Sequence, residues 1–272
     1  MTASVLISVY ARESPGNLAA CLESVVNQTR PADRIVVVKD GPLNEELDAT
    51  IADFEQRRPD LFHIVALPEN RGLITALNRG LEICPTDYVL RMDADDIAAP
   101  GRFEKQLSYM DAHPEVAVLG TAMQEFSDDD TVVRFKPVKE DHADIVRHLP
   151  WRNPINHATV CYRTNIVKEA GGYPELRWLE DYYLWARLIV AGHRFHNLSE
   201  VLYLCRFDDD TLKRRSGWEN FKNECALRLW MYRKGLMGPG TLGAVIATQL
   251  ILRFSPTGLQ RLMWRASRSN QP

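Results

Sequence analysis

The sequence lacks the glycine-rich signatures by which many proteins bind nucleotide phosphates. It has no G-x-x-x-x-G-K-[ST] segment, and the first apolar run is followed by Tyr10-Ala11-Arg12-Glu13 where a dinucleotide fold would have G-x-G-x-x-G. Both a P-loop and a Rossmann turn are therefore excluded. Any phosphate charge would have to be met by a metal ion together with arginine or lysine.

Paired cysteines, a strong net charge and a leader segment are also missing. The five cysteines are widely spaced and form no C-x-x-C pair, which favours free thiols in a reducing compartment and no zinc site. The 33 basic and 36 acidic residues give a formal net charge of −3, so nucleic acid is not an expected partner. No basic, apolar leader follows Met1, so no signal peptide is expected, and the expected location is the cytoplasm.

The segment from Cys225 to Pro272 contains seven arginines and lysines but no Asp or Glu. The chain before this segment therefore holds 26 basic and 36 acidic residues. The asymmetry predicts an acidic body over residues 1–225 and a basic C-terminal segment over residues 226–272 that faces a negative surface. Helix-spaced apolar stripes within the segment consist of Leu242, Val245, Ile246 and Leu250, and of Leu259, Leu262 and Met263 beside Trp264, Arg261, Arg265 and Arg268.

Basic amphipathic helices of this kind suit an anionic membrane surface. Residues 236–254 are nearly long enough to span a bilayer, but Pro239, Gln249 and Arg253 favour lying on it. The alternative is a helical pair that packs on the catalytic body.

Apolar runs alternate with helix-spaced segments along the first hundred residues. Strands are predicted at 5–10, 35–38, 62–67 and 88–92, with helices at 17–27, 47–54 and 72–83 between them. A helix at 104–112, strands at 116–119 and 159–162, and a helix that begins at Glu180 follow. This order predicts an α/β fold with a mainly parallel central sheet covered by helices on both faces. In such sheets ligands bind beyond the carboxyl ends of the strands.

Asp93-Ala94-Asp95-Asp96 directly follows the predicted strand at 88–92, so three carboxylates crowd one strand end. Close like charges repel unless a cation intervenes, and Mg²⁺ or Mn²⁺ fits a site that substrate phosphates complete. The alternative is a solvated acidic turn. A calcium EF-hand loop fits poorly, because Ile97 and Ala98 occupy its fifth and sixth positions.

Two further strand ends carry polar candidates. Asp40 ends the run Val-Val-Val-Lys-Asp-Gly, where its carboxylate could accept a hydrogen bond from a base N–H or could simply form a turn. Tyr10 could stack on a ring or pack against the sheet.

Together these segments resemble the inverting, metal-dependent family 2 glycosyltransferases of the GT-A fold, over residues 4–215. The resemblance is carried by Val-Leu-Ile-Ser-Val-Tyr at 5–10, Val-Val-Asn-Gln-Thr at 25–29, Ile-Val-Val-Val-Lys-Asp-Gly at 35–41, Glu-Asn-Arg-Gly-Leu-Ile-Thr-Ala-Leu-Asn-Arg-Gly-Leu at 69–81 and Tyr-Val-Leu-Arg-Met-Asp-Ala-Asp-Asp at 88–96. Asn-Pro-Ile-Asn-His at 153–157, Gly-Gly-Tyr at 171–173, Leu-Glu-Asp-Tyr at 179–182 and Lys-Arg-Arg-Ser-Gly at 213–217 look like the branch that builds bacterial O-antigen, capsule or exopolysaccharide.

The resemblance implies a role for each matching residue. It makes Ser8, Tyr10 and Asp40 the nucleoside-binding set, and Asn70 or Arg71 a further nucleotide contact. It also makes Asp95 the principal metal ligand, Asp93 a ribose, sugar or metal contact, and Asp96 an uncertain metal ligand. The chain departs from the commoner family pattern at Ala11, where Asn is frequent, and at Lys39, where a second acid is frequent. Neither departure removes a metal ligand.

The later segments supply candidates for catalysis. Asp181 matches the base that takes the acceptor proton, and Glu180 beside it would orient the acceptor or the base. Both acids could instead stabilise the dipole at a helix start. Arg214 and Arg215 are expected either to bind the leaving diphosphate or to form an exposed charged segment. His157 is expected either to contact the metal or the acceptor, or to be a hydrogen-bonded structural residue.

The expected activity is transfer of a sugar, with inversion, from a nucleotide-sugar donor to a saccharide acceptor. UDP is the expected carrier, Mn²⁺ or Mg²⁺ the cofactor, and a lipid-linked saccharide the acceptor, which would place the protein on the inner face of the cell membrane. Three alternatives remain open at this point: a retaining transferase, a nucleotidyltransferase on a similar sheet, and a non-catalytic subunit that binds a nucleotide or scaffolds a biosynthetic complex.

Overall fold

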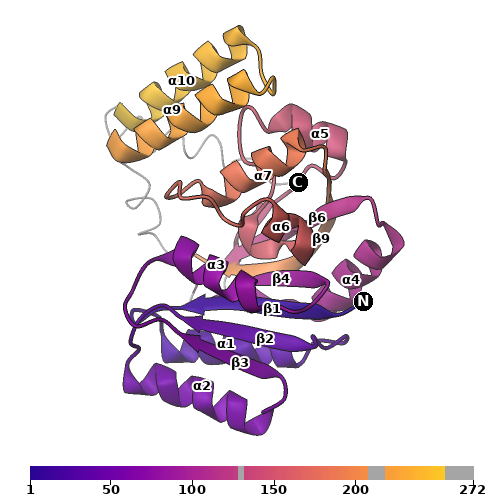
Figure 1. Ribbon diagram of the computed structural model, residues 1–272, viewed down its shortest axis with the longest axis vertical. Helices are drawn as coiled ribbons and strands as arrows, with labels where there is room; N and C mark the ends of the chain where they lie inside the picture. The colour runs from indigo at the N-terminus through magenta and orange to yellow at the C-terminus, as the bar shows by residue number, and fades with distance from the viewer. Residues whose placement is uncertain (128–131, 208–217, 255–272) are drawn as a thin grey trace.

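A computed structural model describes residues 1–127, 132–207 and 218–254 of the chain (Figure 1). Its first half alternates strand and helix as β1 (Ala3–Val9), α1 (Pro15–Val26), β2 (Arg34–Lys39), α2 (Glu45–Arg57), β3 (Phe62–Ala66), α3 (Leu73–Ile83) and β4 (Tyr88–Asp93). Every strand and helix that the sequence predicts in this region is present, with ends that differ by a few residues. The Ser14 side chain caps α1 by accepting a hydrogen bond from the backbone N–H of Asn17.

The second half is less regular than the first. It contains β5 (Ile97–Ala98), α4 (Arg102–Ala112), β6 (Val116–Phe126), β7 (Val132–Lys136), α5 (His142–His148), the 3₁₀ turn η1 (His157–Thr159), β8 (Cys161–Arg163), α6 (Thr164–Glu169), α7 (Glu180–Val190), β9 (Arg194–Arg206), α9 (Trp218–Arg233) and α10 (Pro239–Phe254). Helices at 104–112 and from Glu180 are confirmed. The strand predicted at 159–162 is shifted, because Thr159 belongs to η1 and the strand begins at Cys161.

One sheet of nine strands within the described residues organises the chain, in the order β3-β2-β1-β4-β8-β6-β9-β5, with β7 paired to β6. The neighbours from β3 to β4 are all parallel, and β6 and β9 are parallel as well. Antiparallel pairs join β8 to β4 and β6, and join β5 and β7 to the later strands. The predicted α/β class is confirmed. The carboxyl ends of β1, β2 and β4 consequently meet at one edge of the sheet.

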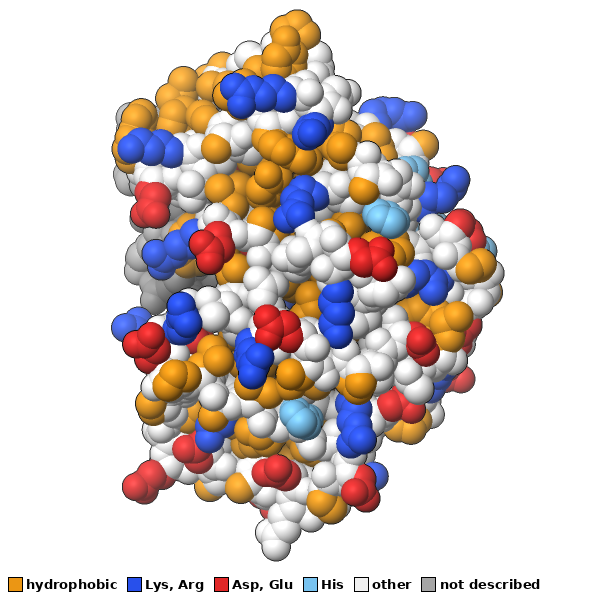
Figure 2. All heavy atoms as spheres, in the orientation of Figure 1, with side chains coloured by type: hydrophobic (Ala, Val, Ile, Leu, Met, Phe, Trp, Pro, Cys, Tyr) orange, Lys and Arg blue, Asp and Glu red, His pale blue; other side chains and the backbone are white. Residues whose placement is uncertain are grey.

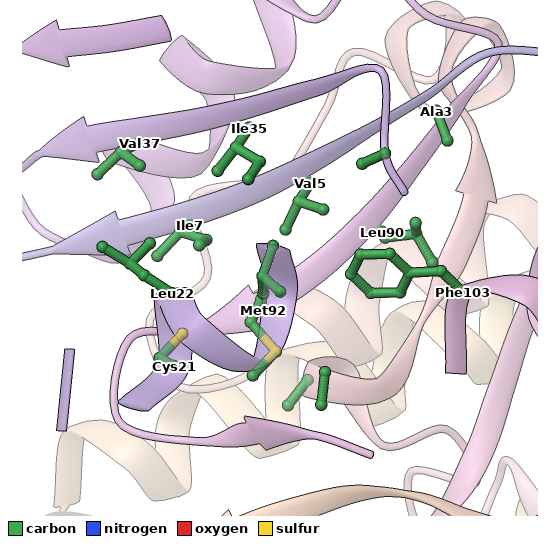
Figure 3. Close-up of a cluster of buried hydrophobic side chains, with 14 of the residues drawn as sticks. Ala3, Val5, Ile7, Cys21, Leu22, Ile35, Val37, Leu90, Met92 and Phe103 are labelled. Atoms are coloured by element: carbon green, nitrogen blue, oxygen red, sulfur yellow. The ribbon is translucent and has the colours of Figure 1, made fainter. Parts of the chain in front are cut away.

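Buried side chains form one hydrophobic cluster on each face of this sheet. Along β1, Val5 and Ile7 belong to the cluster that α1, α2 and α4 cover, whereas Leu6 belongs to the cluster that α3, α6 and α7 cover. Figure 3 shows the first cluster, in which Val5 and Ile7 lie near Met92 of β4. Successive strand residues point to opposite faces, so a continuous apolar run is what a sheet buried on both sides requires.

The C-terminal helices α9 and α10 pack against each other at one end of the molecule (Figure 1). Helix α9 runs through residue 225 without a break, so the boundary predicted there falls inside a helix. Leu227 and Met231 belong to the hydrophobic cluster beneath α7, and Arg228 is only 2% exposed. Arg228 forms an ion pair with Glu224 at 3.1 Å. This part of the basic segment therefore packs on the main body, and the Arg228 charge is not available to an outer surface.

The apolar stripe predicted on α10 is partly buried and partly exposed. Val245 is 2% exposed, and Leu242 packs against the hydrophobic cluster that contains Leu227 and Met231. Leu250 and its neighbour Ile251 are 42% and 51% exposed. The second predicted stripe, Leu259, Leu262 and Met263 with Trp264, Arg261, Arg265 and Arg268, lies outside the described residues.

Candidate active site

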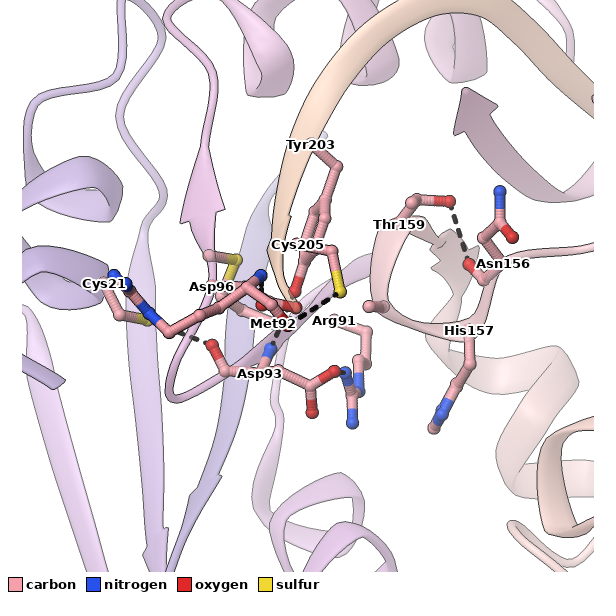
Figure 4. A network of polar contacts seen from close by, with 12 residues as sticks. Cys21, Arg91, Met92, Asp93, Asp96, Asn156, His157, Thr159, Tyr203 and Cys205 are labelled. Atoms are coloured by element: carbon pink, nitrogen blue, oxygen red, sulfur yellow. Dashed lines mark hydrogen bonds and ion pairs between the residues drawn. The ribbon is translucent and has the colours of Figure 1, made fainter. Parts of the chain in front are cut away.

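The carboxyl end of β4 carries the acidic turn that the sequence singled out. Asp93 is the last residue of β4, and Asp95 and Asp96 lie in the turn to β5. Asp93 stands beside Ser8 in the parallel ladder of β1 and β4. Arg91 of β4 is buried, with 2% of its side chain exposed, and forms an ion pair with the Asp93 carboxylate (Figure 4). Asp93 itself remains 37% exposed, so one negative group at this edge faces outward.

Asp95 and Asp96 lie in different surroundings. Burial together with the negative charges of Asp93 and Glu13 raises the pKa of Asp95 to about 7. Asp96 is 2% exposed, and its Oδ1 accepts a hydrogen bond from the backbone N–H of Arg206 at 2.7 Å. Burial first, and then the charges of Asp93 and Asp95, raises the pKa of Asp96 as well. Asp96 therefore ties the acidic turn to the end of β9, and its role as a metal ligand stays a prediction.

This donor set fits a divalent cation that the substrate helps to coordinate. No group of three or more His, Cys, Asp or Glu side chains is arranged to hold a metal ion anywhere in the described residues. Asp93 and Asp95 nevertheless crowd against each other and against Glu13, which a cation would relieve. Mg²⁺ and Mn²⁺ are typically bound by one or two carboxylates plus phosphate oxygens, so Asp93 and Asp95 are sufficient when a diphosphate is present.

Asp40 joins the end of β2 to the start of α3. Its carboxylate is 4% exposed and accepts hydrogen bonds from the backbone N–H groups of Arg71, at 2.8 Å, and Gly72, at 2.9 Å. The Asn70 side-chain amide donates to the Asp40 carbonyl at 3.2 Å. A Cβ on Gly41, whose φ is +86°, would lie 2.5 Å from the Asn70 backbone nitrogen, so only glycine permits this approach. Asp40 is thus a turn residue and a clamp for residues 70–72.

The predicted nucleoside-binding residues are gathered at the same sheet edge. Ser8 lies in β1 between Val38 of β2 and Asp93 of β4, and it is partly buried. Tyr10 follows β1 directly and is 38% exposed, which leaves its ring available for stacking. Asn70 and Arg71 contact Asp40 through the bonds described above. The structure therefore brings these residues together with the acidic turn, while their roles stay predictions.

Glu180 and Asp181 begin α7, within electrostatic reach of the buried Arg91. The Asn153 side-chain amide donates a hydrogen bond to Oδ2 of Asp181 at 2.8 Å, which orients that carboxylate. Burial and the Asp181 charge raise the pKa of Glu180 to about 7, whereas the Arg91 charge lowers it. The guanidinium of Arg91 therefore acts electrostatically on Glu180 as well as on Asp93. Trp178, just before this helix, has a φ of +72°, a strained conformation that is found preferentially at functional sites.

His157 has a protein partner. Its Nε2 lies 3.1 Å from the hydroxyl of Tyr173, and burial, aided by the Arg91 charge, holds its pKa well below the ordinary value. A neutral, hydrogen-bonded ring is what the structural alternative for this residue predicts.

Arg214 and Arg215 lie outside the described residues. The chain before them is nevertheless attached to the acidic turn, because Arg206 donates from Nε to the Asp95 carbonyl at 3.2 Å, in addition to its backbone bond to Asp96. The end of β9 therefore lies beside the predicted metal site.

Sequence reasoning missed four side chains that converge here, namely Glu13, Arg91, Asn153 and Arg206. Arg91 did leave a signal, since it is a charged residue inside the otherwise apolar run Tyr-Val-Leu-Arg-Met. Asn153 lies 28 positions before Asp181 and left none.

Residues 4–169 match the model of the family described as "Glycosyl transferase family 2". The chain belongs to glycosyl transferase family 2. It is therefore a glycosyltransferase. It is 41% identical to the amylovoran biosynthesis glycosyltransferase AmsE of Erwinia amylovora, over 97% of this chain and 98% of that protein. It is 30% identical to an Escherichia coli protein named UDP-Gal:alpha-D-GlcNAc-diphosphoundecaprenol beta-1,3-galactosyltransferase, over 96% of this chain and 94% of that protein.

Solved structures of low sequence identity share the fold. The S. aureus TarS fragment 1–349 in complex with UDP-GlcNAc aligns with 96% of this chain and 78% of its own, at a TM-score of 0.70 and 19% identity. The mannosyltransferase PcManGT from Pyrobaculum calidifontis, in complex with GDP-Man and Mn²⁺, aligns with 99% of this chain and 76% of its own, at a TM-score of 0.64 and 17% identity. The GT-A fold that the resemblance implied is confirmed.

Proposed function

We propose that this glycosyltransferase moves a sugar, with inversion, from a UDP-sugar to a lipid-linked saccharide during the synthesis of a bacterial surface polysaccharide. The observation that carries the proposal is that the buried Arg91 interacts with two acidic sets, through its ion pair with Asp93 and its electrostatic effect on Glu180. Asp93 and Asp95 stand at the end of β4, and Glu180 and Asp181 begin α7. The named relatives support the substrate classes, since one acts in amylovoran biosynthesis and the other carries UDP-Gal and a diphosphoundecaprenol acceptor in its name.

The donor would bind at the carboxyl ends of β1, β2 and β4. Tyr10 would stack on the nucleobase, Ser8 would contact the nucleoside, and Asp40 would hold residues 70–72 against it. Asp93 and Asp95 would hold Mg²⁺ or Mn²⁺ together with the diphosphate oxygens. When bound, the cation would act as a Lewis acid that stabilises the charge on the departing diphosphate. Arg214 and Arg215 would add positive charge there.

Inversion requires the acceptor hydroxyl to attack the sugar from the side opposite the leaving diphosphate. Asp181 would accept the hydroxyl proton while the new bond forms, with the hydrogen bond from Asn153 keeping its carboxylate in position. Glu180 would bind another acceptor hydroxyl. The distance between attacking and leaving groups would be set by α7 and β4, which are parts of one packed body.

A lipid-linked acceptor is presented at a membrane surface, and the helical pair α9–α10 is suited to meet it. None of the helices in the described part of the chain is both long and apolar enough to cross a bilayer. Leu229, Tyr232, Leu250 and Ile251 are between 39% and 51% exposed on these helices. Figure 2 shows apolar side chains with lysine and arginine among them at the end of the molecule where Figure 1 places α9 and α10. We infer that this pair docks on the inner face of the cell membrane.

Two isosteric substitutions test the catalytic proposal. Asp95→Asn should abolish transfer by weakening Mn²⁺-dependent binding of the nucleotide sugar, whereas Asp181→Asn should abolish transfer with that binding intact. Product formation and binding are measured on the same preparations, and the anomeric configuration of the product checks inversion. Asp53→Asn, on the exposed surface of α2, is the matched control and should behave as wild type. Wild-type turnover in both active-site variants would refute the assignment.

A further inference from the structure

A surface cavity of about 400 Å³ lies beside α5 and has no part in the site described above. Five residues line it: Lys139, Asp144, Arg147, His148 and Trp151. Three of them are basic residue types and one is acidic. Asp144 is paired with Arg147 at 2.5 Å, one helical turn away, so these two charges match each other. Lys139 adds a further positive charge, so a ligand in this cavity would meet a net positive charge.

Lys139 and Arg152 both act electrostatically on His148. Burial, together with these two positive charges, lowers the pKa of His148, so its ring is neutral at pH 7 and the positive charge comes from the lysine and arginine side chains. The Arg147 side chain is 77% exposed, and Lys139 is exposed as well, so both can turn toward a ligand. Arginine and lysine recognise phosphate oxygens by charge-assisted hydrogen bonds. Trp151 is 52% exposed, which is unusual for so large an apolar ring and adds a flat face beside the charges.

The cavity wall is attached to the proposed catalytic base. Trp151 is two residues from Asn153, a span of at most about 7 Å, and Asn153 donates the hydrogen bond to Asp181. Leu149, two residues before Trp151, is also attached to α7, because its carbonyl accepts a hydrogen bond from the Tyr182 hydroxyl. A molecule that reached from the cavity to Asp181 would cross only this short segment.

The same segment touches the helical pair that we expect to meet the membrane. Arg228 of α9 donates from Nη1 to the Pro150 carbonyl at 3.3 Å. Leu229, next to Arg228, is 40% exposed, and Tyr232 is 39% exposed. Residues 149–153 therefore contact both α7, which carries the proposed base, and α9, which carries exposed apolar side chains.

We propose that the cavity beside α5 binds the diphosphate of the lipid-linked acceptor. Lys139 and Arg147 hold the phosphate oxygens, Trp151 packs against the first sugar or the first isoprene unit, and the lipid continues along α9. The acceptor saccharide then extends toward Asp181. This inference rests on the proposed function, because a lipid-diphosphate acceptor is part of it, but it concerns side chains to which that function assigns no role.

Calorimetric titration with farnesyl diphosphate, a short isoprenyl diphosphate, tests the inference on the full chain. EDTA is present, so that the donor site lacks its cation. Wild type is compared with the double variant Lys139→Gln/Arg147→Gln, whose substitutions lie at exposed positions and leave the core intact. The control variant is Arg57→Gln, which breaks an equivalent exposed ion pair with Asp53 within α2. Inorganic pyrophosphate and farnesol are titrated in parallel, and UDP with Mn²⁺ is titrated separately to check the donor site.

We expect the double variant to bind farnesyl diphosphate at least about tenfold more weakly than wild type, and Arg57→Gln to bind it as wild type does. Farnesol should bind weakly to all three proteins. Equal affinity of wild type and the double variant, or no binding while UDP and Mn²⁺ bind normally, would overturn the inference without affecting the proposed function. Equal affinities for pyrophosphate and farnesyl diphosphate would assign the cavity to a free phosphate and overturn it too. Failure of UDP and every other nucleotide to bind with Mn²⁺ would instead contradict the proposed function.

Discussion

Substitution of Asp40 by asparagine tests whether this residue acts as a clamp. In the structure its two carboxylate oxygens accept hydrogen bonds from the backbone N–H groups of Arg71 and Gly72, and the side chain is buried. Hydrogen bonds to a buried charged group contribute about 1.5–3 kcal/mol each. Asparagine keeps one acceptor oxygen, but it turns an amide N–H toward the other backbone N–H. We therefore expect Asp40→Asn to lower the free energy of unfolding by about 2–4 kcal/mol.

Urea denaturation at pH 7 measures this loss, with Asp53→Asn as the control. Asp53 is an exposed acid paired with Arg57, so its substitution should change the free energy of unfolding by less than about 0.5 kcal/mol. Because the clamp positions residues 70–72, the affinities for UDP and CDP should fall together in Asp40→Asn. Unchanged stability, combined with weaker binding of UDP alone, would refute the reasoning. It would show that Asp40 contacts the base directly.

Three further changes test other parts of the account. Asn153→Leu removes the donor that orients Asp181, so kcat should fall about 10- to 100-fold with the donor KM unchanged, and an unaltered kcat in steady-state assays would contradict this role. Burial raises the pKa of Glu180 from 4.5 to about 7. Between pH 4.5 and 7 the folded state therefore binds more protons than the unfolded state, and Glu180 should lower the free energy of unfolding progressively as the pH rises through this range. Glu180→Gln should therefore be stabilised relative to wild type at pH 8 but not at pH 4.5, and urea denaturation that gives the same difference at both pH values would exclude this effect. Leu250→Ser/Ile251→Ser should weaken binding to anionic liposomes while leaving the fold intact, and undiminished co-sedimentation would show that α10 is not the docking surface.

The fold was largely predictable because β1, β2 and β4 are buried on both faces. Each such strand is a short apolar run, and β1 and β4 contribute side chains to both clusters. Strand β9 was not predicted from the sequence, and the reason is physical. Its pairing with β6 shifts between Leu198 and Val201, and this irregularity brings Ser199 and Glu200 into the strand and interrupts the alternation by which a half-buried strand is recognised.

The candidate site was predictable where its residues end strands. Asp40 and Asp93 follow apolar runs directly, so their placement at the sheet edge could be derived from the sequence. Partnerships across the fold could not. The contact of Asn153 with Asp181 depends on packing between α7 and the segment after α5. The burial of Arg228 depends on α9 packing against the hydrophobic cluster that α7 covers.

The most direct measurement of the central claim is calorimetric titration of the wild-type chain with activated monosaccharides, with and without Mn²⁺. The account predicts binding of at least one nucleotide sugar, dependent on the cation, lost in Asp95→Asn and retained in Asp181→Asn. Binding that is equally strong in EDTA and in Asp95→Asn, or no heat with any common nucleotide sugar in either condition, would contradict it.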